Sequence, residues 1–225
     1  RLALEDAGAD YVDVARLPEG SGGGTAALLR MLDDPSTGHP SFAPQFLKAG
    51  RRLIGQTANI LLFLGPRLGL APREESGRLW AHQLQLTITD LLVEIHDSHH
   101  PIAGSLYYED QRDEAKRRSA SLRRERLPKF LSWFERVLAD NARGRQRFLV
   151  GSATSCADLS LFQVIEGLRY AFPRTMRRLE TSVPRIIELH DRVAARSALA
   201  SYLESPRRIP FNNDGIFRRY PELDG

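Results

Sequence analysis

Three short segments of the sequence carry residues whose types and spacing could bind a ligand. In the first, residues 42–47 (Phe-Ala-Pro-Gln-Phe-Leu), Pro44 precedes a predicted strand. Proline fits the start of a strand because it has no N–H to give to the ladder. A cis bond before Pro44 would turn the Ala43 backbone outward and leave its N–H and C=O free for an extended ligand. Because only about 5% of X-Pro bonds are cis, the spacing alone favours a trans bond.

The second segment, residues 54–60 (Ile-Gly-Gln-Thr-Ala-Asn-Ile), reads as a junction between a strand and a helix. Free backbone N–H groups at the start of a helix favour an anion such as a carboxylate. Gln56 can both donate and accept hydrogen bonds, and Thr57 can donate to that anion. The alternative, which the segment favours when taken alone, is that Thr57 only caps the helix.

The third segment, residues 151–159, indicates a structural feature. Ser155 and Asp158 have the spacing of a capping box, with Asp in place of the usual Glu. They are expected to start a buried helix and to do no chemistry. Cys156 falls in the first turn of that helix, where a thiolate could be stabilised. We interpret it as a packed apolar residue, because free cysteine is among the most buried residue types.

Histidines and glycines form two further clusters. His96, His99 and His100 have a spacing that could suggest a metal site, but no zinc-protease pattern accompanies them. A loop of solvated histidines is the preferred interpretation, and no metal is predicted. The glycine-rich stretch 20–24 lacks the Gly-Lys-Ser/Thr ending of a phosphate-binding loop, so it is interpreted as a flexible loop.

Short, mixed elements are expected before residue 70. The pattern predicts the end of a helix over residues 1–7, a strand over 10–14, a helix over 26–32, strands over 45–47 and 52–54 with a turn at 49–50, and a helix over 57–64 stopped by Gly65-Pro66. The first helix and strand look like the end of a β-α-β unit whose beginning is missing.

Almost everything after residue 70 is expected to be helical. Residues 68–73 have linker composition, which predicts domains over 1–67 and 74–225. Apolar residues at helical spacing predict one face of a long helix: Leu84, Ile88, Leu91, Leu92 and Ile95. Further helices are predicted over 114–141, 158–171, 186–195 and 199–204, with a kink in the first of these at Pro128.

Charge and cysteine content restrict the class of partner. The net charge is +4, but acidic residues are interleaved with the basic ones, and the densest basic stretch, 116–126, lacks aromatic residues and a nucleic-acid-binding motif. It favours a solvated helix face, with weak anion attraction near a cleft as the alternative. No apolar run reaches membrane-spanning length, no targeting segment is evident, and one cysteine cannot form an intrachain disulfide. We therefore predict a cytoplasmic protein with no nucleic-acid or membrane partner.

In their order along the chain, these segments resemble the soluble glutathione transferase superfamily, with sigma, alpha and pi classes nearest. The resemblance rests on the proline-led strand, the hairpin, Gln-Thr at the start of a helix, the Leu-Gly-Leu-Ala-Pro linker and the motif at 151–159. It runs from Leu2 to about Ala195. It implies an α+β fold: a thioredoxin-like N-terminal domain, with its first strand absent or truncated, and an all-α helical-bundle C-terminal domain.

Particular residues receive roles from this resemblance. Pro44 matches the family's cis-proline, and Ala43 matches the residue whose backbone pairs with the cysteinyl part of glutathione. Gln56 and Thr57 match the pair that holds the γ-glutamyl end. Asp90 resembles an aspartate that reaches across the dimer to the γ-glutamyl amine. The assignment depends on a cis Ala43–Pro44 bond and on Gln56 and Thr57 facing a cleft.

The catalytic residue is not assigned. In the family it lies on or just after the first strand, which would precede Arg1, and Tyr11 is not a substitute because it falls on the second strand of the pattern. The resemblance implies conjugation of the glutathione thiolate to a small hydrophobic electrophile, with glutathione as co-substrate, no metal and a homodimeric assembly. His96 and His100 lie where the family's electrophile pocket usually lies.

Two alternative functions remain open. The first is a non-catalytic glutathione-binding, ligand-binding or scaffold protein of the same fold. The second, glutathione-dependent thiol–disulfide exchange, needs a cysteine at the missing position, and Cys156 belongs to the other domain.

Overall fold

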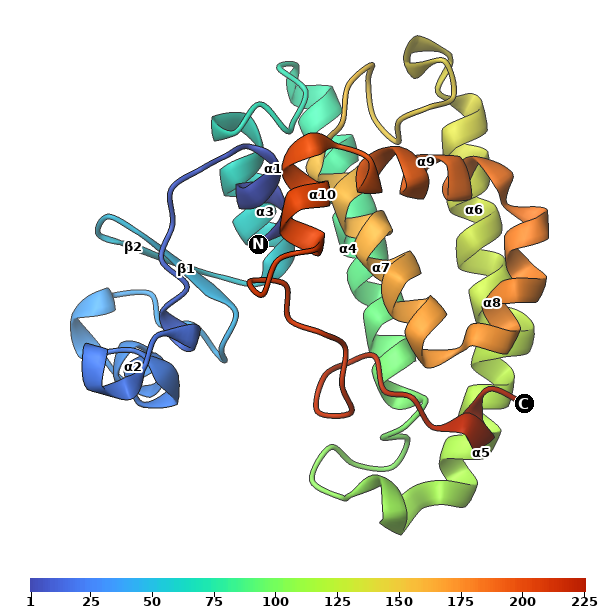
Figure 1. The fold of residues 1–225 in the computed structure, drawn as a ribbon, viewed down its shortest axis with the longest axis horizontal. Helices are drawn as coiled ribbons and strands as arrows, with labels where there is room; N and C mark the ends of the chain where they lie inside the picture. Colours follow the sequence, from blue (N-terminus) through green and yellow to red (C-terminus); the bar gives the residue numbers. More distant parts are fainter.

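A small N-terminal region with one β-hairpin lies beside a larger bundle of helices in the computed structural model (Figure 1). The structure describes residues 1–36 and 38–225 in full. The helices and strands of the N-terminal region are α1 (Leu2–Asp6), α2 (Gly24–Leu32), β1 (Phe46–Ala49), β2 (Arg52–Gly55) and α3 (Thr57–Arg67).

The hairpin confirms the prediction from the alternating apolar residues and the glycine turn. β1 and β2 pair antiparallel, with Phe46 opposite Gly55 and Ala49 opposite Arg52. Gly50 takes the left-handed conformation, φ 61°, that the tight turn requires. Among the described residues, these two strands form the only sheet.

The strand predicted over residues 10–14 is wrong. This segment is irregular and leads into a 3₁₀ turn at Val14–Arg16. A strand needs a neighbour to satisfy its backbone groups, and in the described part of the chain β1 pairs only with β2. The segment is held by side chains instead: the Tyr11 hydroxyl donates to the Glu5 carboxylate at 2.7 Å.

The prediction that Gly65-Pro66 stops the helix after Leu64 is also wrong, because α3 continues to Arg67. Pro66 lies in the last turn, where its missing N–H frees only one carbonyl near the helix end. Gly65 serves a close approach: a Cβ there would lie 3.0 Å from the Ala71 Cβ and 3.5 Å from the Cys156 sulfur.

The bundle follows the predicted helical pattern. Its helices are α4 (Glu75–Asp97), α5 (Arg112–Ser121), α6 (Leu127–Asp140), α7 (Cys156–Ala171), α8 (Pro173–Leu179), α9 (Pro184–Ala194) and α10 (Ser197–Leu203). One turn of π-helix, Leu122–Arg126, joins α5 to α6 directly before Pro128. A proline in a helix frees the carbonyl four residues earlier, so irregularity at this point is expected.

The helix α7 forms the centre of the bundle and packs against α4 and α9. Its buried apolar side chains include Leu161, Phe162, Ile165 and Leu168. Burying each such side chain contributes roughly 1.5–3 kcal/mol, so α7 is the main source of cohesion. No helix in the described residues is both long and apolar enough to cross a membrane.

The segment after α10, which the sequence did not predict, crosses the bundle and ends beside α8 (Figure 1). Phe217 packs on Gly167 of α7, where a Cβ would lie 2.4 Å from the ring. The Asp224 carboxylate accepts hydrogen bonds from the backbone amides of Arg174, at 2.7 Å, and Thr175, at 3.0 Å. We call residues 205–225 the C-terminal tail.

Candidate functional site

The junction between β2 and α3 presents backbone amides at a helix start. The first hydrogen bond of α3 runs from the Ile60 amide to the Gln56 carbonyl at 2.8 Å, so the amides of residues 57–59 have no acceptor within the helix. Gln56 is exposed and has φ 66°, a left-handed conformation that costs a non-glycine residue about 1–3 kcal/mol. Such strain occurs preferentially where a backbone is shaped for a ligand.

The loop before β1 lies against this junction. The Thr57 hydroxyl donates to the Gln45 side-chain oxygen at 2.8 Å. A Cβ on Gly55 would lie 2.6 Å from the Ser41 hydroxyl, so the loop approaches the end of β2 closely. The structure therefore brings the Ala43–Pro44 segment near Gln56 and Thr57. Gln56, not Thr57, is the N-cap residue, and its side chain makes no capping hydrogen bond.

The cis bond implied before Pro44 is wrong, because no cis peptide bond occurs in the described residues. A cis X-Pro bond persists where the surroundings enforce it, whereas Pro44 is exposed in a bend before β1. The Ala43 carbonyl already accepts one hydrogen bond, from the Ser41 hydroxyl at 2.9 Å. The cis bond on which the glutathione-site assignment depends is therefore not met. The roles implied for Ala43 and Pro44 lose their geometric basis, and the candidate site rests on Gln56 and Thr57, both exposed.

Ser155 and Asp158 form a capping box at the start of α7. The Asp158 carboxylate is fully buried and accepts hydrogen bonds from the Ser155 amide at 2.7 Å, the Ser155 hydroxyl at 2.6 Å and the Leu149 amide at 2.8 Å. Cys156 is buried beside it. Burial raises the pKa of the Cys156 thiol to about 12, so it is not a ready thiolate.

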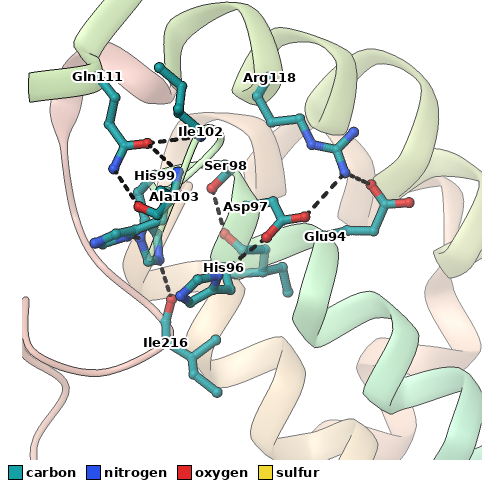
Figure 2. A network of polar contacts seen from close by, with 12 residues as sticks. Glu94, His96, Asp97, Ser98, His99, Ile102, Ala103, Gln111, Arg118 and Ile216 are labelled. Atoms are coloured by element: carbon teal, nitrogen blue, oxygen red, sulfur yellow. Dashed lines mark hydrogen bonds and ion pairs between the residues drawn. The ribbon is translucent and has the colours of Figure 1, made fainter. Parts of the chain in front are cut away.

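The three histidines gather at the C-terminal end of α4, with ring centroids 4.8–5.4 Å apart. Figure 2 shows His96 and His99 of this group. His99 is buried, and its Nε2 lies 2.8 Å from the Ile216 carbonyl of the C-terminal tail. A carbonyl only accepts, so Nε2 carries the proton and the His99 Nδ1 accepts from the His100 Nδ1–H at 2.6 Å. The His96 ring stacks on His100, with centroids 5.1 Å apart. The interpretation as a solvated loop is therefore wrong for His99.

This histidine cluster fastens the C-terminal tail to the bundle. Burial lowers the pKa of His99 to about 4, which keeps its ring neutral. Beside the cluster, Gln111 accepts from the Ile102 amide at 2.9 Å and donates to the Ala103 carbonyl at 3.1 Å (Figure 2). In the described part of the chain, no group of three or more His, Cys, Asp or Glu residues is arranged to hold a metal ion.

Comparisons with known proteins fit this arrangement. Residues 96–206 match the family model for the C-terminal domain of glutathione S-transferase. No curated protein matches the chain. This match identifies residues 96–206 as a C-terminal domain of the glutathione S-transferase type.

Solved structures share the fold of the whole chain. A pi-class glutathione S-transferase of Onchocerca volvulus has a TM-score of 0.66 at 22% identity, over 91% of this chain and 85% of that chain. A prostaglandin synthase D of Nilaparvata lugens has a TM-score of 0.67 at 18% identity, over 93% of this chain and 92% of that chain. The structure named NaGST-2 has a TM-score of 0.62 at 20% identity, over 94% of this chain and 91% of that chain.

The interface between the N-terminal region and the bundle is where the electrophile is expected to bind. A cavity there, lined by residues of α3, the first half of α4 and the start of α7, includes Pro66, Gln85 and Cys156. It offers ≈ 20 Å³, which is near the volume of about 10–15 Å³ that one water molecule needs. The side-chain nitrogen of Gln85 is buried there without a hydrogen-bond partner. The cavity suits a bound water and is too small for an electrophile.

The remaining predicted residues lie apart from the junction. His96 and His100 do not line this cavity: His96 lies in the last turn of α4 and His100 follows that helix, whereas the cavity lies at the first half of α4. Asp90 is exposed on α4, and its predicted role needs a second subunit. Sequence reasoning missed Gln45 as a partner of Thr57. The hairpin register could have indicated this contact, because pairing Phe46 with Gly55 places Gln45 opposite Gln56 and so beside Thr57.

Proposed function

We propose that the chain binds glutathione at the β2–α3 junction. The γ-glutamyl carboxylate lies on the unused amides at the start of α3, and the side chains of Gln56 and Thr57 complete its hydrogen bonds. The observation that carries this proposal is the left-handed Gln56 beside these amides, because it aims backbone donors at one exposed point. A helix N-terminus favours an anion by about 0.3–1 kcal/mol, and charged hydrogen bonds add to this.

The activity we propose is conjugation of the glutathione thiolate to a small hydrophobic electrophile. A group that donates to the sulfur favours the thiolate, which is the nucleophile. We assign no such group to the described residues. The Tyr11 hydroxyl already donates to Glu5, and burial, followed by that hydrogen bond, raises its pKa to about 12. Cys156 is buried in α7, in the bundle.

The second candidate function that we propose is glutathione binding without conjugation. In that case the superfamily fold serves as a ligand-binding or scaffold protein, and Gln56 and Thr57 keep their role. A cytoplasmic location belongs to both proposals. It is supported by a single cysteine, which is buried and unpaired.

A homodimer is part of the proposal. Three large apolar side chains stand exposed on α4 at seven-residue spacing: Leu79 at 64%, Leu86 at 48% and Val93 at 55%. This spacing places them in one row along the helix, as in helices that pair. Asp90 lies between the last two in sequence. A partner that covers the row would also bury the surface beside Asp90, which suits its predicted reach to the other subunit's glutathione.

The binding proposal is tested by calorimetry with reduced glutathione. Gln56→Ala removes hydrogen bonds to a charged group, worth about 1.5–3 kcal/mol, so the affinity should fall roughly tenfold or more. The matched control is Gln83→Ala, which removes an exposed amide side chain from α4 and should leave the affinity unchanged. Equal affinities of Gln56→Ala and the unsubstituted chain would show that glutathione binds elsewhere.

The two candidate functions separate in a second assay. A chain that binds glutathione and conjugates it to a chlorodinitrobenzene is a transferase. A chain that binds glutathione with the same dependence on Gln56 but gives no conjugate above the uncatalysed rate is a binding protein.

A further inference from the structure

A second cavity lies on the bundle, between the loop before α7 and the helix α9. Its volume is ≈ 190 Å³, far above the roughly 10–15 Å³ that one water molecule needs. Three arginines contribute to its lining, Arg147 from the loop and Arg192 and Arg196 from α9 and the residues that follow it. The side chains of Thr154 and Asp158 complete its polar lining.

Arg147 and Arg192 are neighbours of like charge. The Arg192 guanidinium donates to the Arg147 backbone carbonyl, which places the two residues side by side. Burial, and then the charge of Arg147, lowers the pKa of Arg192. The Glu188 carboxylate approaches Arg192 only to 4.0 Å and is 69% exposed, so it offsets little of this repulsion. Within the described residues, the Arg147 guanidinium takes part in no ion pair.

The other polar groups of the cavity offset this positive charge only in part: the charges of Glu188 and Asp158 raise the pKa of Arg192 less than burial and Arg147 lower it. Arg196 pairs with Asp6 at 2.8 Å and donates to the Thr154 hydroxyl oxygen at 3.0 Å. Because that oxygen accepts from Arg196, the Thr154 hydroxyl proton is free to be donated to a ligand. Both oxygens of Asp158 are turned to the amides of Leu149 and Ser155, so they form no ion pair with the arginines.

We propose that this cavity, the Arg147–Arg192 cavity, binds a small anion through a phosphate or diphosphate group. Arg147 has no ion pair among the described residues, and Arg192 has only the exposed Glu188 at 4.0 Å. Their two guanidinium groups present forked donors, which match phosphate oxygens in pairs. The bound anion removes the repulsion between Arg147 and Arg192 and accepts a hydrogen bond from Thr154. The volume accommodates more than one phosphate group. The cavity is separate from the β2–α3 junction and does not depend on glutathione binding.

The first test is calorimetry of the full chain with pyrophosphate, inorganic phosphate and adenosine diphosphate at low chloride. Pyrophosphate should bind saturably, with a dissociation constant below about 1 mM. If only the free inorganic anions bind, the ligand is a free phosphate compound. If the nucleotide binds more tightly, the cavity holds the diphosphate of a larger molecule. No saturable binding of any of the three overturns the proposal.

Two substitutions test whether pyrophosphate binds in the Arg147–Arg192 cavity. Arg147→Gln should weaken pyrophosphate binding about tenfold or more, since it removes one forked, charged contact. The matched control is Arg145→Gln, which removes the same charge from the same loop at an exposed position outside the cavity lining. Arg145 has a positive φ of 49°, and the neighbouring Gln146 has φ 61°, so the loop already holds a glutamine in the same type of backbone conformation.

Equal weakening by the two substitutions would mean diffuse attraction to a basic surface and would overturn the proposal. Competition between pyrophosphate and glutathione would also overturn it, because the two sites are separate. Folding of the Arg147→Gln variant is checked by its melting temperature without ligand. Pyrophosphate should raise the melting temperature of the unsubstituted chain by mass action and should raise that of the Arg147→Gln variant much less.

Discussion

Replacing Asp158 by alanine removes the acceptor that organises the start of the central helix α7. Three donors lose their partner: the Leu149 amide at 2.8 Å, the Ser155 amide at 2.7 Å and the Ser155 hydroxyl at 2.6 Å. The hydroxyl can rotate to another acceptor, but the two amides are fixed by the backbone. A buried donor left unpaired costs about 1–3 kcal/mol, so the two amides together cost roughly 2–6 kcal/mol.

For a chain of 225 residues, each kcal/mol shifts the melting temperature by about 2–4 °C. A loss of about 4 kcal/mol of stability, the middle of this range, therefore lowers the melting temperature by roughly 8–16 °C. Asp158→Asn should lose about half as much, because its oxygen can still accept from Leu149 while its NH₂ group faces the Ser155 amide. Burial raises the pKa of Asp158, so removal of its charge recovers part of the loss.

The assay is thermal and urea unfolding followed by circular dichroism. Asp113→Ala is the matched control: it removes an acidic residue from the first turn of α5, where the side chain is 82% exposed and pairs only with Lys116. A surface pair of this kind contributes about 0–1 kcal/mol. If Asp158→Ala were as stable as this control, the buried capping box would not hold α7 in the way we describe.

Three further predictions follow from other contacts. The fold keeps His99 neutral, with a pKa of about 4 against 6.5 for an ordinary histidine. Stability against unfolding should therefore be lost progressively as the pH falls from 6.5 to 4, by roughly 3 kcal/mol in all. His99→Gln should flatten this part of a curve of stability against pH. Gly167→Ala sets a Cβ 2.4 Å from the Phe217 ring and should loosen the C-terminal tail, seen as faster hydrogen exchange and proteolysis there, whereas Gly104→Ala, at a position with open space, should change neither. Leu86→Glu should convert a dimer to a monomer in size-exclusion chromatography with light scattering, and a monomeric unsubstituted chain would contradict the proposed pairing through α4.

Local sequence signals predicted most of the helices and the hairpin. The apolar face of α4 and the turn at Gly50 are readable because spacing and glycine content act over a few residues. The strand over 10–14 failed because a strand depends on a partner that spacing cannot supply. The C-terminal tail was missed because its contacts, such as Phe217 on Gly167, join residues far apart in the chain.

In the candidate site, too, residues set by a local sequence pattern were predictable, and residues brought together from separate elements were not. Gln56 and Thr57 were selected for their place at a strand–helix junction, and that junction is where the structure has it. The cis bond at Pro44 was inferred from resemblance, against the base rate for X-Pro bonds, and it does not occur. The arginines of the Arg147–Arg192 cavity come from separate elements, so no single motif could indicate them.

The position of the β2–α3 junction depends on the bundle as well as on the hairpin. Gly65 brings α3 against Ala71 and Cys156, and the Cys156 amide donates to the Leu70 carbonyl at 2.9 Å. The start of α7, organised by Asp158, therefore supports the segment on which α3 rests. Because a two-stranded hairpin alone is marginally stable, the amides at the start of α3 keep their direction through this packing. Glutathione binding in our proposal thus requires the helical bundle, although none of the residues assigned to hold the γ-glutamyl carboxylate belongs to it.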